Sequence, residues 1–170
     1  HADNFRFMGV RDADWFESWI KNNLENDYWR RNSYNEYERV RVPSFQMTGW
    51  FDANFPGSPQ NYIGMKKAGP TSEARSPHLM IGPWMHAINV SQKLAGIDYG
   101  RDSLVDLDGL ICRWFDYWLK GVGNGVKDRK PVSVFVMGVN RWYEEQDWPL
   151  PQTQWTKYYL DSGGKANSLK

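Results

Sequence analysis

The chain has 170 residues, of which 41% are hydrophobic and 24% are charged. This balance is typical of a globular protein with a buried core and unlike that of disordered chains. The formal net charge of +1 offers no electrostatic footprint for nucleic acid. No stretch approaches the roughly 18 consecutive apolar residues of a membrane span. A single cysteine excludes an intrachain disulfide and leaves the cellular compartment open.

The first expected element is a short amphipathic helix between Asp12 and Leu24. Asp14, followed three residues later by Glu17, resembles a capping box at its start. The apolar side chains recur at helical spacing, at Trp15, Phe16, Trp19, Ile20 and Leu24. The polar, tyrosine-rich segment 25–39 is expected to form a helical turn and a loop.

A strand and a helix are expected next. From Val40 to Gly49, apolar and polar residues alternate, which is typical of a strand, and the glycine ends it. Ser58 followed by Pro59 predicts the N-cap and first residue of a helix, and Gly69 supplies its end.

A second strand and a second helix follow. The short apolar run 77–81, closed by Gly82, is typical of a strand buried on both faces. The strongest helical pattern covers 104–119, where one face carries Leu104, Leu107, Leu110, Ile111, Trp114, Phe115, Trp118 and Leu119. Alternation of strands with helices favours parallel strands and right-handed crossovers, so the predicted fold class is α/β.

The pattern changes after the glycine-rich segment 121–131. Residues 132–137 alternate with a period of two, and 155–160 alternate again. We therefore expect the opening strands of an all-β domain here. Two or three strands cannot cover their own faces and edges, so further chain or another part of the protein is expected to cover them.

Two side chains could carry chemistry. Asp52 and His86 follow consecutive predicted strands, and functional residues in open α/β sheets gather beyond the carboxyl ends of the strands. A carboxylate that accepts the imidazole Nδ1–H leaves Nε2 free to take a proton from a serine hydroxyl. Taken singly, however, an aspartate after a strand is most often a turn residue and a loop histidine is most often polar surface.

The sequences around these residues resemble one family of serine hydrolases. The matching motifs, in chain order, are Asp27-Tyr28-Trp29, Gly49-Trp50-Phe51-Asp52, Gly82-Pro83-Trp84-x-His86, Trp114-Phe115-Asp116, Val134-Phe135-Val136-Met137-Gly138 and Asp147-Trp148-Pro149-Leu150-Pro151. They are similar to segments of the family that contains cocaine esterase, glutaryl-cephalosporin acylases and Xaa-Pro dipeptidyl peptidases. The resemblance covers nearly the whole chain.

The resemblance implies the C-terminal part of an α/β-hydrolase sheet with a cap remnant, followed by the first strands of a β jelly-roll domain. The implied divisions are 1–35 for the end of the helical cap, 36–125 for the hydrolase domain and 130–170 for the jelly roll. A complete hydrolase domain needs about 200–250 residues. We therefore expect a fragment that depends on the remaining part of the same hydrolase.

The resemblance also implies that Asp52 and His86 are the acid and base of a catalytic triad. The chain contains no Gly-x-Ser-x-Gly, so the serine is expected upstream and this polypeptide alone should be inactive. The expected substrate is an ester, an amide or an Xaa-Pro peptide. Carboxylates that bind a substrate ammonium in the amino-acid ester hydrolase branch are missing after Asp52, which disfavours such a substrate.

Other side chains have two interpretations. Trp50, Phe55 and Trp84 neighbour the triad candidates and are candidates for substrate binding, although packing beneath the loops explains the tryptophans equally well. Three scattered histidines and one cysteine have no metal-ligand spacing, so neither a metal nor another cofactor is expected. The alternative function is a non-catalytic binding unit whose tryptophan-rich surface recognises carbohydrate or a partner protein.

Overall fold

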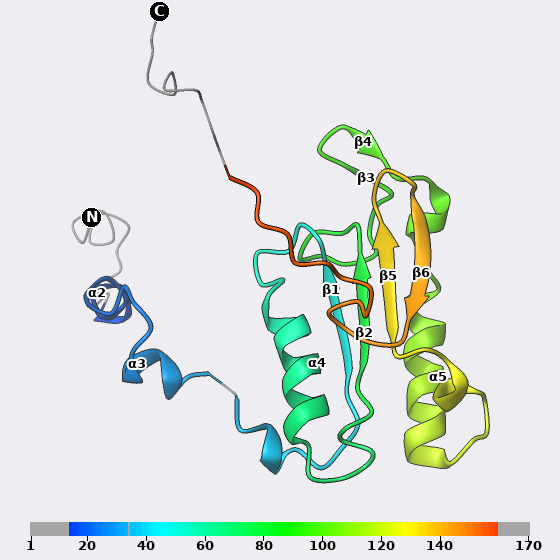
Figure 1. Cartoon of the computed structure of the whole chain (residues 1–170), viewed down its shortest axis with the longest axis horizontal. Coiled ribbons are helices and arrows are strands. Elements are labelled where there is room, and N and C mark those ends of the chain that lie inside the picture. Colours follow the sequence, from blue (N-terminus) through cyan, green and yellow to red (C-terminus); the bar gives the residue numbers. More distant parts are fainter. Residues whose placement is uncertain (1–13, 34, 160–170) are drawn as a thin grey trace, which may run out of the picture.

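The computed structural model describes residues 14–33 and 35–159. The N-terminal helices α2 and α3 lie apart from the sheet and the helices that cover it (Figure 1). In chain order the elements are α2 (Asp14–Lys21), α3 (Asp27–Arg30), the 3-10 helix η1 (Tyr37–Arg39), β1 (Phe45–Gly49), α4 (Gly57–Ala68), β2 (His78–Gly82), β3 (Lys93–Leu94), β4 (Ile97–Asp98), η2 (Arg101–Ser103), α5 (Leu107–Lys120), η3 (Val126–Asp128), β5 (Val132–Val136) and β6 (Arg141–Glu145). Among these, no helix is long and apolar enough to cross a membrane.

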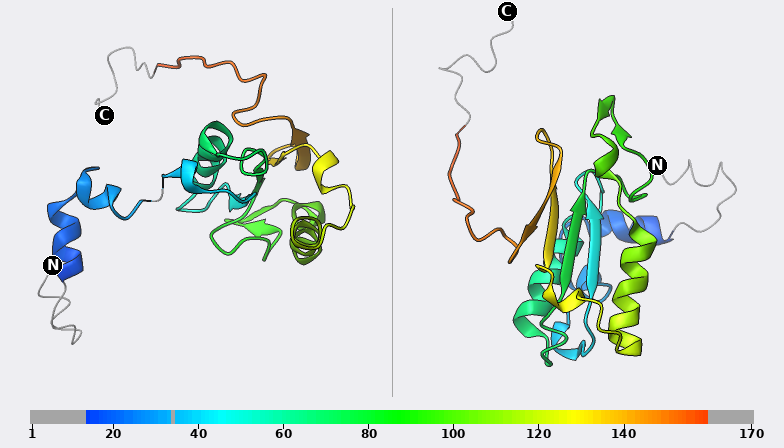
Figure 2. Two further views of the ribbon diagram at one scale, coloured as in Figure 1. Left: turned by 90° about the horizontal axis from the view of Figure 1, so that it is seen from below. Right: turned by 90° about the vertical axis from the view of Figure 1, so that its right-hand side faces the viewer.

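The main sheet has the strand order β1-β2-β5-β6. β1 pairs with β2 in parallel, with Gly49 opposite Gly82, so both strands end at the same level. β5 is parallel to β2, and β6 is antiparallel to β5. Helices α4 and α5 cover opposite faces of this sheet (Figure 2). The prediction of an α/β arrangement with a mostly parallel sheet is therefore confirmed.

The core lies between α4 and one face of the sheet. Tyr62 of α4 is fully buried there, and it packs against alternate residues of β2 and β5, which is the two-residue period of strands. The buried cluster consists of Tyr62, Leu79, Ile81, Val132 and Val134, with the partly buried Trp50, Phe55, Trp148 and Leu150 packed against it. The segment after β6 thus contributes to the same core as α4.

Helix α5 covers the other face through Trp114, whose ring lies 5.4 Å from that of Phe45 and 5.1 Å from that of His78. The helix begins later than residue 104 because the Asp106 side chain accepts a hydrogen bond from Gly109 N and caps it. It ends where Gly121 adopts a left-handed conformation, with φ of 71°.

Three further sequence-based expectations differ from the structure. Ser58 does not cap α4, because the helix already begins at Gly57 and Pro56 occupies the cap position. The period-two strand after residue 131 does not start a separate sheet, because β5 forms its hydrogen bonds with β2. Residues 155–159 form no strand, and the antiparallel neighbour of β5 among the described residues is β6, which the sequence pattern did not indicate.

His78 begins β2 and contacts the ring of Trp114. Burial, together with the nearby charge of Arg129, lowers the pKa of His78 to about 4 from its ordinary value near 6.5. The folded chain therefore keeps His78 neutral over a range in which the unfolded chain binds a proton. Folding stability consequently rises with pH across that range.

We predict that the free energy of unfolding falls as the pH is lowered from about 6.5 to about 4, by roughly 2–3 kcal/mol from this histidine. The substitution His78→Gln removes the proton-binding group and should flatten this part of the curve. Urea unfolding of both proteins at several pH values measures the difference. Equal slopes for the two proteins would contradict the assignment.

Candidate functional site

The loops that follow β1 and β2 bring Asp52 and His86 together. Because the two strands run parallel and in register, their carboxyl ends meet at one edge. His86 Nδ1 lies 3.2 Å from Asp52 Oδ1 and 3.4 Å from Oδ2. The Asp52 side chain is only 9% exposed, whereas that of His86 is 79% exposed. The pair thus has the geometry of an oriented imidazole with an accessible outer edge.

Backbone hydrogen bonds continue past the ends of the strands and fix this geometry. Trp50 N donates to Gly82 O at 2.9 Å, and Phe51 N donates to Trp84 O at 3.0 Å. This pairing requires a glycine at position 49, because a Cβ there would lie 2.0 Å from Trp84 O. The loop carrying Asp52 is therefore attached to the loop carrying His86 by main-chain contacts.

Trp84 lies beneath the histidine loop. Its side chain is 2% exposed, and its Nε1 donates to Ser103 O at 3.0 Å. The ring packs near Trp142, with 5.5 Å between centroids, and it occupies the space where a Cβ on Gly82 would lie. These contacts favour the packing interpretation of Trp84 over the substrate-binding one.

Trp50 and Phe55 lie together on the other side of the loop pair. Their rings stack at 5.1 Å with an interplanar angle of 30°, and both are partly buried against the core. The Trp50 Nε1 donates to Phe135 O at 2.8 Å. The structure therefore brings two of the three substrate-binding candidates into contact with each other, against a core cluster that does not include Trp84.

Asn54 contacts both Asp52 and His86, and the sequence analysis did not predict this. Its backbone N–H donates to Asp52 Oδ1 at 2.8 Å, and its Nδ2 lies 3.4 Å from His86 Nδ1. The Asn54 N–H and the neighbouring imidazole lower the pKa of Asp52 despite an opposing contribution from burial, so this side chain is a carboxylate at neutral pH. The sequence Asp52-Ala53-Asn54 could have indicated this contact, because an aspartate side chain in a turn often accepts a hydrogen bond from the backbone N–H two residues later.

Two exposed apolar side chains flank the pair and were also missed. Phe51 precedes Asp52 and Met85 precedes His86, and both are exposed. These two side chains place apolar surface beside the pair. No group of three or more His, Cys, Asp or Glu side chains among the described residues is arranged to hold a metal ion.

Residues 3–88 match the X-Pro dipeptidyl-peptidase (S15 family), and residues 124–170 match the X-Pro dipeptidyl-peptidase C-terminal non-catalytic domain. Over 161 residues the chain is 29% identical to cocaine esterase from Rhodococcus sp. (strain MB1 Bresler), a match that covers 91% of this chain and 26% of that protein. The chain therefore spans about a quarter of the length of this relative.

Solved structures share the fold. An aminopeptidase from a marine sediment Thaumarchaeota archaeon superposes with a TM-score of 0.70 at 20% identity, covering 86% of this chain and 24% of that one. An α-amino acid ester hydrolase superposes with a TM-score of 0.64 at 19% identity, covering 85% of this chain and 24% of that one. The arrangement of α4, α5 and the parallel strands is thus one found in larger hydrolase chains.

We predict that Gly49→Ala lowers the free energy of unfolding by about 2–3 kcal/mol, because the added methyl group meets main-chain atoms that cannot move independently. Gly57→Ala is the matched control, since a Cβ at Gly57 has no atom within 4 Å. That control should be neutral or stabilising by up to about 1 kcal/mol. Urea unfolding measures both, and equal losses would refute the steric explanation.

Proposed function

Because this chain belongs to the X-Pro dipeptidyl-peptidase (S15) family of serine hydrolases, we propose that Asp52 and His86 are the acid and base of an acyl-transfer triad. The observation that carries the proposal is the 3.2 Å contact between His86 Nδ1 and Asp52 Oδ1. The order of the two residues along the chain also suits a hydrolase whose serine precedes them. We assign that serine to the remaining part of the same hydrolase.

In the proposed reaction, Asp52 accepts the hydrogen bond of His86 Nδ1–H and fixes the imidazole tautomer. Nε2 takes the proton of the serine hydroxyl as its oxygen attacks the carbonyl carbon of an ester or amide. The imidazolium then gives that proton to the departing alcohol or amine, which leaves an acyl-enzyme. Water hydrolyses the acyl-enzyme by the same proton transfers in a second half-reaction. The lowered pKa of Asp52 supports its role as a permanent carboxylate.

The domain assignment is also part of the proposal. We assign 1–35 to the end of a helical cap and 36–125 to the hydrolase domain. We assign 130–170 to the start of the β jelly-roll domain, with β5 and β6 extending the same sheet as β1 and β2. The match of 124–170 to a non-catalytic C-terminal domain supports a change of domain near this segment.

For the substrate we propose an ester or amide with an uncharged acyl group. Ala53, Asn54 and Phe55 follow Asp52, so no carboxylate immediately after Asp52 can bind a substrate ammonium. The exposed Phe51 and Met85 flank the pair with apolar surface. The stacked rings of Trp50 and Phe55, packed on the core and only partly buried, are proposed as the floor of this surface. An Xaa-Pro peptide is the second substrate class, because the matched family is named for that activity.

The alternative of a tryptophan-rich binding unit has less support. Recognition of carbohydrate by aromatic side chains would use exposed, coplanar rings. The exposed Trp15 and Trp19 instead meet edge to face, with an interplanar angle of 76°. Trp50 and Trp84 use their indole N–H groups to bond main-chain carbonyls within the fold. These contacts are those of packed side chains.

We predict that the full-length hydrolase reacts with a fluorophosphonate serine probe and that His86→Ala reduces the labelling rate at least 100-fold, since the base no longer activates the serine. His78→Gln is the matched control, because His78 lies at the opposite end of β2 and should leave labelling unchanged. Gel fluorescence measures both rates. Full labelling of His86→Ala would exclude His86 from the mechanism.

We further predict that Asn54→Asp moves the acidic limb of the kcat/KM pH profile to higher pH. A second carboxylate about 3.4 Å from His86 Nδ1 favours the imidazolium, so the base is lost at a higher pH. Asn23→Asp, which adds the same charge at an exposed position in the N-terminal segment, should leave the profile unchanged. A profile of Asn54→Asp identical to that of the parent would contradict a positioning role for Asn54.

A further inference from the structure

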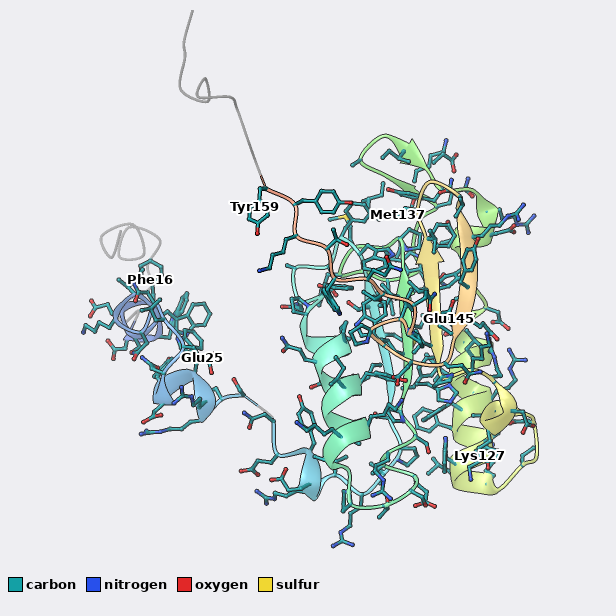
Figure 3. The ribbon with its side chains drawn as sticks, in the orientation of Figure 1. Phe16, Glu25, Lys127, Met137, Glu145 and Tyr159 are labelled. Carbon is teal, nitrogen blue, oxygen red and sulfur yellow. The ribbon has the colours of Figure 1, made fainter. Side chains whose placement is uncertain are left out.

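A groove lies at the end of the sheet opposite Asp52 and His86. It has a volume of about 440 Å³ and is bounded by α4, the end of α5, η3 and the segments that lead into β2 and β5. Figure 3 shows Lys127 beside the lower end of α5, whereas Met137, just beyond β5, lies at the upper end of the sheet. The length of the strands thus separates the groove from Asp52 and His86.

The lining of this groove is rich in cations. The basic side chains are Lys66, Arg75, Lys127, Arg129 and Lys130, and Asp128 is the carboxylate among the lining residues. Two of these cations are neutralised by residues nearby: Lys66 Nζ lies 2.6 Å from Asp147 Oδ2, and Arg129 pairs with the Glu144 carboxylate.

The other three cations have no carboxylate partner within 4.0 Å among residues 14–33 and 35–159. Arg75 donates to the neutral carbonyl of Gly69 at 2.8 Å, and Lys130 donates to that of Glu144 at 2.9 Å. Asp128 in the lining and Glu73, whose pKa is lowered in part by Lys127, offset part of this charge, and a net charge of about +1 remains. A phosphate group carries about −1.5 to −2 at neutral pH and is attracted by this positive charge.

One wall of the groove is aromatic. Trp118 lines it, and Lys127 Nζ lies 5.9 Å from the centroid of this ring. The Trp118 Nε1 is buried and has no acceptor among the described residues. The groove therefore combines positive charge with an aromatic surface.

We propose that this groove binds a small molecule that carries a phosphate group, with the phosphate near Arg75, Lys127 and Lys130 and an apolar or aromatic part on Trp118. The volume lies in the range of small-molecule sites. The proposal does not rest on the triad, because none of the residues that line the groove belongs to the loops carrying Asp52 and His86.

The test is to titrate the full-length protein with inorganic phosphate and, separately, with phenyl phosphate, and to measure binding by isothermal titration calorimetry. Saturable binding is expected for both, with phenyl phosphate binding several-fold more tightly because its ring contacts Trp118. Arg75→Gln and Lys130→Gln should each weaken binding about tenfold, since each removes a charge-assisted hydrogen bond. Arg101→Gln, which removes an exposed cation in η2, is the matched control and should change nothing.

Absence of saturable binding for both probes would overturn the proposal. Equal weakening by Arg101→Gln would also overturn it, because it would show a general charge effect. If Arg75→Gln fails to fold through loss of its bond to Gly69 O, Lys127→Gln replaces it, since Lys127 Nζ lies 5.9 Å from the Trp118 ring and its side chain makes no hydrogen bond among the described residues. Unchanged binding in both Lys127→Gln and Lys130→Gln would then refute the site.

Discussion

The close approach of Gly49 to the main chain at Trp84 is the constraint on which the functional end of the molecule depends. The hydrogen bond from Phe51 N to Trp84 O forms only where no Cβ separates the two loops. It places the residue after Phe51 opposite the loop that bears His86. The 3.2 Å contact between Asp52 and His86 therefore follows from main-chain geometry and not from attraction between the two side chains alone.

The same constraint explains the two tryptophans of the loops. The Trp84 side chain is buried and fills the space next to Gly82, so it supports the loop that carries His86. Trp50 anchors the aspartate loop by bonding Phe135 O in β5. Each loop is thus fixed by contacts with a different part of the fold. Such support from packing and secondary contacts is what holds reacting groups in a fixed geometry.

The segment after β6 stabilises the face of the sheet that α4 covers. Asp147 pairs with Lys66 of α4 and accepts a hydrogen bond from the buried Tyr62 hydroxyl at 3.4 Å. Burial and this carboxylate raise the pKa of Tyr62, which stays a neutral donor. Trp148 and Leu150 then pack on the core. The core of the sheet thus lies between two sites. The Asp52–His86 pair lies beyond the carboxyl ends of the parallel strands, and the cationic groove lies near their amino ends.

The sequence by itself determined the alternation of strands and helices, the ends of α4 and α5 at Gly69 and Gly121, and the pairing of Asp52 with His86 as candidates. These features depend on local periodicity, on glycine and on short motifs. Tertiary structure decided that β5 joins β2, that Trp84 is buried and that Asn54 contacts the imidazole. No local pattern specifies these outcomes, because strand partners and buried space are set by residues far apart in the chain.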